Sequence, residues 1–333
     1  MLKTLTKVAA AAALSFAFAP GIAAAKTELK LATIAPEGTP WYAFMDEWAK
    51  NVAEASNGEM EIAIFPSAQL GNEWEVWTKV VKGRVDIGVF SGAVMAEKVP
   101  PLSLMSTPFL FDSEQTIYCV YDTQLKDEFT AMLEEHAKVI SWAETGWAHI
   151  YAKDDLSDVA AAEGYKTRVA PHAMSRLLWS SAGANGVEIP YADTPAALQT
   201  GLVRSGESTA IAYVAFGLTK VAPHYMLTKH MHQAGSILMG KNTWAKLSEE
   251  EQRILVESVP GVNGLRAGAN GVEQFMIGKY KEAGGPVHEL TPEQRAAWKA
   301  KVEANYPAYV EGLGAEAQAL WPRLLQAKAA CGE

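Results

Sequence analysis

Two histidines two positions apart, His230 and His232, are the side chains whose spacing best suits metal binding. In a strand such a pair points to one face, as zinc ligands do. Zinc needs three or four ligands, and no third His, Asp or Glu stands nearby at ligand spacing. Ordinary hydrogen-bonded histidines are the competing interpretation. An exported zinc-binding protein therefore remains only as an alternative function.

Other patterns that mark catalysis or nucleotide binding are missing from the sequence. No serine has a glycine both two positions before it and two positions after it, so a nucleophile elbow is absent. Gly261, Gly264, Gly268 and Gly271 share one face of an expected helix, but no strand leads into them and no Lys-Ser or Lys-Thr follows. We expect a small-residue stripe that another backbone approaches closely. The absence of these motifs favours a binding protein over an enzyme.

Composition limits the class of protein. The 333 residues are 49% hydrophobic and carry a formal net charge of -9. This content excludes a disordered chain, and the length favours about two domains. Because no segment is rich in Lys or Arg, the acidic chain offers no site for nucleic-acid phosphates and little attraction to an anionic membrane.

The first 25 residues have the pattern of a secretory signal peptide. Lys3 and Lys7 precede or border an apolar run from Val8 to Ala19, and small residues at 23–25 predict cleavage after Ala25. The apolar run is shorter than the ~20 residues that span a bilayer, and no later segment is long and apolar enough. We therefore expect a soluble protein exported to the periplasm and not embedded in the membrane.

Cys119 and Cys331 are the two cysteines of the chain. An oxidising compartment permits them to form a disulfide, but the sequence does not give the distance between them. Two free thiols are the alternative. In either case two cysteines are too few to be the framework of a domain this large.

The hydrophobic pattern predicts alternating strands and helices. The first expected strands are 29–35, 60–65 and 85–90, separated by helices that begin at Thr39-Pro40 and at Glu73. A second sheet is expected from strands at 139–142, 149–152, 166–170, 187–189, 208–214 and 236–239. Further helices are expected at 174–182 and 194–202, and after the capping-box residues Ser248 and Thr291. Such alternation predicts an α/β fold, and because no linker separates the parts, the chain is expected to cross between two lobes more than once.

Seven short motifs follow one another along the mature chain: Gln69-Leu70-Gly71-Asn72-Glu73, Gly83-Arg84-Val85-Asp86-Ile87, Pro108-Phe109-Leu110-Phe111, Lys166-Thr167-Arg168-Val169, Gly183-Ala184-Asn185, Ala197-Leu198-Gln199-Thr200-Gly201 and Trp244-Ala245-Lys246-Leu247-Ser248. In order and spacing they resemble the substrate-binding proteins of the tripartite ATP-independent periplasmic (TRAP) transporters, of the dicarboxylate-binding-subunit (DctP-like) family. The resemblance covers nearly the whole mature chain.

The resemblance implies a two-lobed periplasmic binding protein fold with an interdomain cleft, crossing strands and a long lobe-spanning helix. Lobe I would comprise residues 26–148 plus about 238–278, and lobe II residues 149–237 plus about 279–333. The implied function is to capture a small organic acid, without a cofactor and without catalysis. The protein would then deliver the acid to the membrane permease subunits of the transporter, which are driven by an ion.

The family also implies roles for single residues. Its carboxylate-binding arginine matches Arg168, and a guanidinium suits this role because it holds a carboxylate through two parallel hydrogen bonds and keeps its charge when buried. A second family contact, an asparagine, falls on Ser208 in the stretch Arg204–Thr209. A serine hydroxyl can still donate one hydrogen bond to a carboxylate.

Ala148 stands where many members of the family carry another arginine. One buried cation would leave the second charge of a dicarboxylate unpaired, so we expect a monocarboxylate or a ligand whose far end is neutral, and possibilities for that end are apolar or aromatic. Five side chains are expected around the space that Ala148 leaves: Trp147, His149, Tyr191, Tyr213 and Phe216.

The resemblance places five residues of lobe I at the distal end of the ligand: Trp41, Asn72, Glu73, Phe90 and Ser91. Glu73 would repel a bare carboxylate but suits a hydroxyl, an amide or an amine. A periplasmic enzyme acting on a small organic acid in the same cleft remains a further alternative function.

Overall fold

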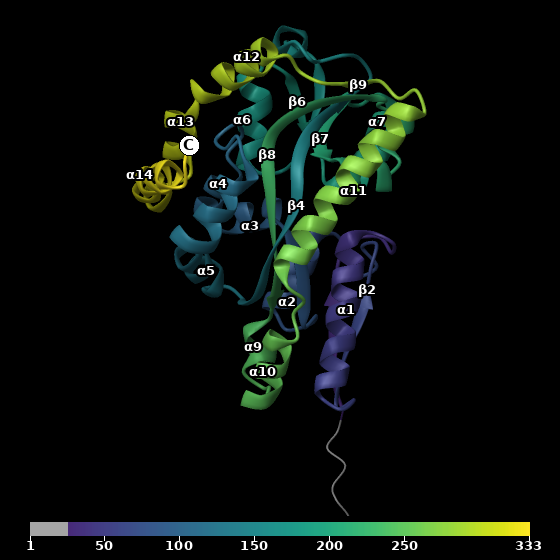
Figure 1. The fold of residues 1–333 in the computed structure, drawn as a ribbon, viewed down its shortest axis with the longest axis vertical. Helices are drawn as coiled ribbons and strands as arrows, with labels where there is room; N and C mark the ends of the chain where they lie inside the picture. The colour runs from purple at the N-terminus through teal and green to yellow at the C-terminus, as the bar shows by residue number, and fades with distance from the viewer. Residues whose placement is uncertain (1–25) are drawn as a thin grey trace, which may run out of the picture.

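The computed structural model describes residues 26–333, and the predicted signal peptide, residues 1–25, lies outside the described residues (Figure 1). The strands are β1 (Thr27–Ala32), β2 (Met60–Phe65), β3 (Ile87–Ser91), β4 (Lys138–Ala152), β5 (Lys166–Val169), β6 (Asn185–Glu188), β7 (Ser205–Thr209), β8 (His224–Met239) and β9 (Val287–His288). The helices are α1 (Pro40–Ala55), α2 (Glu73–Val81), α3 (Gly92–Lys98), α4 (Glu114–Cys119), α5 (Lys126–Glu134), α6 (Ala173–Ser181), α7 (Thr194–Thr200), α8 (Ala210–Ala215), α9 (Lys241–Trp244), α10 (Glu249–Glu257), α11 (Val262–Glu282), α12 (Pro292–Glu303), α13 (Tyr306–Gly312) and α14 (Ala315–Ala330).

The strands form one continuous sheet in the order β2-β1-β3-β8-β4-β7-β5-β6, with β9 beside β8. The outer strands pair in parallel, β1 with β2 and β3, and β5 with β6 and β7. The long strands β4 and β8 pair antiparallel with each other and join the two parallel groups. The two expected sheets are therefore the two ends of one sheet, and the expected crossing strands are confirmed.

Several helices begin where the sequence signals predicted. The Thr39 hydroxyl accepts the Tyr42 N–H at the start of α1, with Pro40 as the first helical residue. Capping boxes start α2, α10 and α12, the last two at Ser248 and Thr291 as expected. A capping side chain accepts a backbone N–H that has no partner within the helix, which explains why these short signals are reliable.

Four expected strands differ in the structure. Residues 139–142 and 149–152 belong to the single strand β4, and 236–239 is only the end of β8. The expected strand 208–214 is wrong beyond Thr209, because α8 begins there: the Thr209 hydroxyl accepts the Ala212 N–H and caps the helix. The local run of small and β-branched residues resembles a buried strand. The cap at Thr209 instead favours a helix over Ala210–Ala215.

The long helix α11 lies across β4 and contacts α1 at one end of the sheet and α8 and β9 at the other (Figure 1). This confirms the expected lobe-spanning helix. The expected close backbone approach to its glycines is wrong within the described chain. A Cβ added at Gly261, Gly264, Gly268 or Gly271 would meet no described atom within 4 Å.

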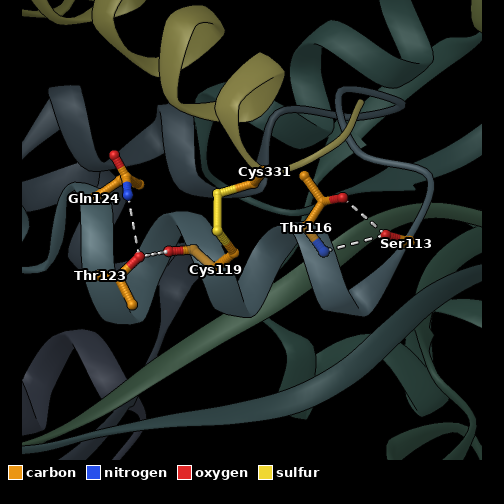
Figure 2. Close-up of a disulfide and its surroundings, with 6 residues drawn as sticks. All are labelled: Ser113, Thr116, Cys119, Thr123, Gln124 and Cys331. Carbon is orange, nitrogen blue, oxygen red and sulfur yellow. Dashed lines mark hydrogen bonds between the residues drawn. A yellow bond between two sulfur atoms is a disulfide. The ribbon is translucent and has the colours of Figure 1, made fainter.

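The end of the chain folds back on the middle of the sequence. α13 and α14 follow α12, and α14 packs on the 3-10 helix Pro100–Ser106 and on the short π-helix Val120–Gln124. Cys331, which follows α14, forms a disulfide with Cys119 at the end of α4, and the two Cα atoms are 5.9 Å apart (Figure 2). The segments so joined were assigned to different lobes from the sequence, and that division of the lobes stays a prediction.

None of the helices within residues 26–333 is long and apolar enough to cross a membrane.

Candidate ligand-binding site

Two adjoining cavities lie where the carboxyl ends of β1 and β3 face those of β5 and β7. The polar compartment is lined by Trp74, Gly92, Ala93, Ser106, Arg168, Ala170, His172, Met174, Glu207, Ser208, Met231 and Gln233. The apolar compartment is lined by Thr33, Ala35, Pro36, Thr39, Trp41, Val89, Phe90, Ile211, Ala215 and Phe216. Both are lined by Ile34, Glu73, Ser91, Tyr191, Thr209 and Ala212. These residues come from both ends of the sheet. The two compartments therefore form the cleft that the family resemblance predicted.

Arg168 reaches the polar compartment from β5 and is only 3% exposed. Its Nε donates to the Ile189 carbonyl at 2.9 Å, and its guanidinium lies over the Tyr191 ring at 5.3 Å from the centroid. These contacts hold the guanidinium plane and leave its two terminal nitrogens without a hydrogen bond to any described residue. The arrangement can present two parallel N–H donors to a carboxylate.

Glu207, on β7, is a buried carboxylate of the same compartment that the sequence analysis did not select. The Ser175 hydroxyl and the Trp179 indole N–H donate to its two oxygens, and its Oε1 lies 3.8 Å from Arg168 Nη1. Burial raises the pKa of Glu207, and the nearby Arg168 opposes that rise. Its position beside Ser208 in the matched stretch was the available signal, but sequence alone did not show that it faces Arg168.

The hydroxyl groups of Ser208 and Tyr191 make no hydrogen bond of good geometry to the described residues, although they lie near enough to each other for Ser208 to lower the pKa of Tyr191 against the effect of burial. Both atoms are buried, and both side chains line the polar compartment. A buried hydroxyl without a partner is costly, so each is a group that a bound ligand could satisfy.

His172, the N-cap of α6, is a second residue that the sequence analysis missed. Its Nδ1 accepts the Ser175 N–H at 3.2 Å. Burial, with Arg168 and Arg176 nearby, lowers the pKa of His172 to about 3, so the ring is neutral near neutral pH. A neutral ring that accepts at Nδ1 carries its proton on Nε2, which makes His172 a hydrogen-bond donor and not a cation.

Glu73 is the first residue of α2 and lines both compartments. Its two carboxylate oxygens accept from the Ser91 N–H at 2.6 Å and from the Ser91 hydroxyl at 3.0 Å. Burial raises the pKa of Glu73 to about 7, against the lowering effect of the two Ser91 bonds. The ion pairs of the described residues include none to this carboxylate.

Aromatic side chains from both ends of the sheet close the apolar compartment. Trp41 comes from the side of β1 and β3, and Phe216 comes from the end of α8. Phe90 also lines the compartment, but its ring packs edge to face on Trp77, with the centroids 5.3 Å apart. Phe216 meets Tyr191 edge to face, with the ring centroids 4.8 Å apart. The Trp41 indole N–H is buried and has no partner in the described chain.

Eight of the twelve predicted site residues therefore line the cleft: Arg168, Ser208, Tyr191, Glu73, Ser91, Phe90, Trp41 and Phe216. The other four lie elsewhere, for local reasons.

Trp147 and His149 lie on the face of β4 that α11 covers. Trp147 packs edge to face on His232 at 5.2 Å and lines a separate recess with Glu273 of α11. His149 Nε2 is 3.4 Å from Glu273 Oε1, and its Nδ1 accepts the Lys229 N–H. Ala148, between them, is fully buried and does not line the cleft, so the expected extra space beside it is absent.

Asn72 and Tyr213 are occupied in structural contacts. The Asn72 side chain caps α2 by accepting the Glu75 N–H at 3.0 Å. Tyr213 stacks on Tyr225 at 4.4 Å and donates its hydroxyl to the Ala222 carbonyl. Because α8 is a helix, Tyr213 turns into the core while Ala212 and Ala215 face the cleft.

The two histidines considered for zinc make separate contacts in β8. His230 Nδ1 lies 2.7 Å from the Thr228 hydroxyl, and His232 packs on Trp147. Across residues 26–333, no three His, Cys, Asp or Glu side chains come together to hold a metal ion. Within the described residues, His230 and His232 therefore belong to no group that could bind zinc.

Comparison with known proteins agrees with this geometry. Residues 31–312 match the family model DctP, described as bacterial extracellular solute-binding protein, family 7. A solute-binding protein of Chromohalobacter salexigens is 26% identical and aligns over 84% of this chain and 83% of its own length. The 2,3-diketo-L-gulonate-binding periplasmic protein YiaO of Escherichia coli is 26% identical over 74% of this chain and 75% of its own. The crystal structure of a TRAP periplasmic solute-binding protein from Desulfovibrio salexigens with bound orotic acid has a TM-score of 0.86 at 24% identity, covering 92% of this chain and all of that one.

Proposed function

The chain belongs to family 7 of the bacterial extracellular solute-binding proteins, and on this premise we propose that it binds a small organic acid with a single carboxylate and an apolar or aromatic remainder. It is a TRAP substrate-binding protein of the DctP type, and proteins of this family are transport components and not enzymes. TRAP solute-binding proteins are periplasmic. Cleavage after Ala25 and delivery of the acid to an ion-driven permease are part of the proposal.

The observation that carries the proposal is the charge of the cleft. Among the described residues that line its two compartments, Arg168 is the one Lys or Arg side chain. The free terminal N–H groups of one guanidinium can hold one ligand carboxylate, and a second ligand carboxylate would be buried beside Glu73 or Glu207 without a cation to donate to it. The aromatic walls of the apolar compartment instead favour a hydrocarbon or ring. These features support a monocarboxylate over a dicarboxylate.

We assign the ligand contacts on the same basis. Arg168, Ser208 and Tyr191 would hold the carboxylate, and Glu73 with Ser91 would contact the middle of the ligand. Trp41, Phe90 and Phe216 would cover its apolar part. The named acids of two similar proteins, 2,3-diketo-L-gulonate and orotic acid, support an organic acid as the class of solute.

A matched panel of acids tests the proposal. Isothermal titration calorimetry would compare pairs that share a skeleton and differ by one carboxylate, such as benzoate with phthalate and isocaproate with methylglutarate. We expect the monocarboxylate of each pair to bind more tightly, and no product to form on prolonged incubation. Tighter binding of the diacids would overturn the single-charge argument, and turnover would instead favour the alternative of a periplasmic enzyme.

The cleft also predicts a movement. We propose that residues 26–148 with about 238–278 and residues 149–237 with about 279–333 act as two lobes that close over the acid. The hinge would be in β4 and β8, where the pairing register shifts between Glu144 and Gly146 and again between Ala148 and Ile150. Small-angle X-ray scattering with and without saturating ligand should show a smaller radius of gyration in the bound form. Superimposable profiles would argue against closure.

A further inference from the structure

Glu73 carries a buried carboxylate that has no cationic partner among the described residues. It is only 7% exposed, and its two hydrogen bonds both come from Ser91. A carboxylate has about four lone-pair directions, so each oxygen can accept another hydrogen bond. Leaving a buried carboxylate partly satisfied is costly, and the raised pKa of Glu73 reports that cost. The site therefore lacks a donor at this position.

The position of Glu73 in the cleft indicates which part of a ligand could donate a hydrogen bond to it. Arg168 lines the polar compartment only, and Phe216 lines the apolar compartment only. Glu73 lines both, so it lies where they join. An acid with its carboxylate on Arg168 and its tail against Phe216 must pass Glu73 between these two ends.

We infer that the solute carries a hydroxyl or ammonium donor on the carbon next to its carboxylate, and an apolar side chain beyond it. This inference rests on the proposed function and narrows its substrate class to amino acids and hydroxy acids with apolar side chains. The sequence analysis placed Glu73 at the distal end of the ligand, whereas in the structure it lies at the junction of the two compartments. The same geometry disfavours a keto acid while Glu73 is ionised, because a ketone oxygen has no proton to donate to the carboxylate.

The charges in the cleft predict which donor, an ammonium or a hydroxyl, gives the higher affinity. Arg168 already has one buried carboxylate nearby, that of Glu207, with Nη1 and Oε1 3.8 Å apart. A hydroxy acid would add a further negative charge to the cleft, whereas a zwitterionic amino acid adds none and pairs its ammonium with Glu73. A buried charge is tolerated when it is paired and hydrogen-bonded. The amino acid is therefore expected to bind more tightly than the hydroxy acid.

Four acids with one carbon skeleton provide the test: leucine, its hydroxy analogue leucic acid, its keto analogue ketoleucine, and isocaproic acid, which has only hydrogens at that carbon. Calorimetry at about pH 8.5, above the Glu73 pKa of about 7, on the mature protein freed of endogenous ligand by unfolding and refolding would give the four affinities with Glu73 ionised. We expect leucine and leucic acid to bind about 10- to 100-fold more tightly than isocaproic acid, with ketoleucine no better than isocaproic acid.

Two variants separate the role of Glu73 from a general effect on the fold. In Glu73→Gln the amide oxygen can still accept from a hydroxyl but cannot pair with an ammonium, so leucine should lose about 10- to 100-fold and leucic acid only a few-fold. Glu47→Gln, which removes an exposed carboxylate from α1, should leave all four affinities unchanged. A melting curve like that of the wild type would show that Glu73→Gln is folded, and Ser91→Ala offers a second way to disturb the Glu73 carboxylate.

The outcomes distinguish this inference from the proposed function. If isocaproic acid or ketoleucine binds as tightly as leucine and leucic acid, the inference is wrong while the proposed monocarboxylate function stands. The inference is also overturned if Glu73→Gln lowers all four affinities equally, because the effect is then not directed at the donor. If all four fail and a dicarboxylate binds, the proposed function itself is wrong.

Discussion

The guanidinium of Arg168 and the carboxylate of Glu207 face one another at the floor of the polar compartment, with Nη1 3.8 Å from Oε1. The distance is too long for a hydrogen bond, and Glu207 is instead held by Ser175 and Trp179. Arg168 is therefore charge-balanced in the free protein while its terminal N–H groups remain free of hydrogen bonds to the described residues. A ligand carboxylate would compete with Glu207 for the positive charge but not for the hydrogen bonds.

Removing the guanidinium should abolish most of the binding. We expect Arg168→Ala to lower the affinity for the best acid by tens- to thousands-fold, because truncating one side of a buried charge pair costs about 2–5 kcal/mol. Arg168→Lys should be intermediate, since an ammonium cannot form two parallel hydrogen bonds. Arg204→Ala, which removes an exposed arginine paired with Asp154, is the matched control. Calorimetry that finds wild-type affinity in Arg168→Ala would contradict the site assignment.

Binding of an acid that carries no ammonium, such as leucic acid, should take up protons. A carboxylate brought to Arg168 adds negative charge near Glu207, whose pKa burial already raises, and so favours protonation of Glu207. The affinity for a fixed anion should therefore rise as pH falls toward the pKa of Glu207 in the complex. Titrations in buffers of different ionisation enthalpy measure the uptake directly. Glu207→Gln should reduce it, and Glu188→Gln, an exposed carboxylate on β6, should not.

Glu73 should make the unliganded protein less stable at high pH. Burial raises the pKa of Glu73 to about 7 from an ordinary value of 4.5. When folding raises the pKa of a carboxyl group, its contribution to the stability of the fold is fully present at pH values below the pKa in the unfolded chain. That contribution is lost as the pH rises through the pKa in the folded protein. Relative to Glu73→Gln, the wild type should lose roughly 2–3 kcal/mol of unfolding free energy between about pH 5 and about pH 8. Urea titrations whose pH dependence is parallel in the two proteins would refute this.

The apolar compartment should select the tail of the acid. Phe216→Ala removes an aromatic wall, so the affinity for an acid with a branched or aromatic side chain should fall by about 5- to 30-fold, or about 1–2 kcal/mol. A short acid such as lactate does not reach this wall and should be little affected. Phe275→Ala is the control, because Phe275 is 63% exposed on α11. Equal losses for short and long acids would show that Phe216 acts on the fold and not on the tail.

The disulfide should stabilise the chain by joining distant segments. Cys119 and Cys331 are 212 residues apart in the sequence, so their bond restricts the unfolded chain strongly. We expect the double variant Cys119→Ser, Cys331→Ser to lose about 2–5 kcal/mol of unfolding free energy in denaturant titrations. Limited proteolysis should then cut first near α13 and α14. A double variant as stable as the wild type would show that packing of α14 on residues 100–106 is sufficient alone.

Local signals in the sequence predicted much of the fold. Capping residues such as Thr39 and Ser248 act on backbone groups a few positions away, so their effect does not depend on the rest of the chain. The same locality explains the error at 208–214, where one threonine cap outweighed a strand-like pattern. The order of the seven motifs was informative in a different way. It matched Arg168 and Ser208 to the two positions from which members of the family bind the ligand carboxylate.

The sequence by itself indicated the class of protein, the α/β fold and the arginine on which the proposed function rests, and it predicts an export signal in residues 1–25. Only the tertiary structure decided which neighbours reach the cleft. Successive residues of a strand point to opposite faces, so Trp147 and His149 lie on the face of β4 that α11 covers. The sequence analysis expected them at the cleft because they flank Ala148, where many members of the family carry an arginine. The pairing of Cys119 with Cys331, the position of Glu207 and the place of Glu73 between two compartments all depend on how distant segments pack, and no local pattern encodes that packing.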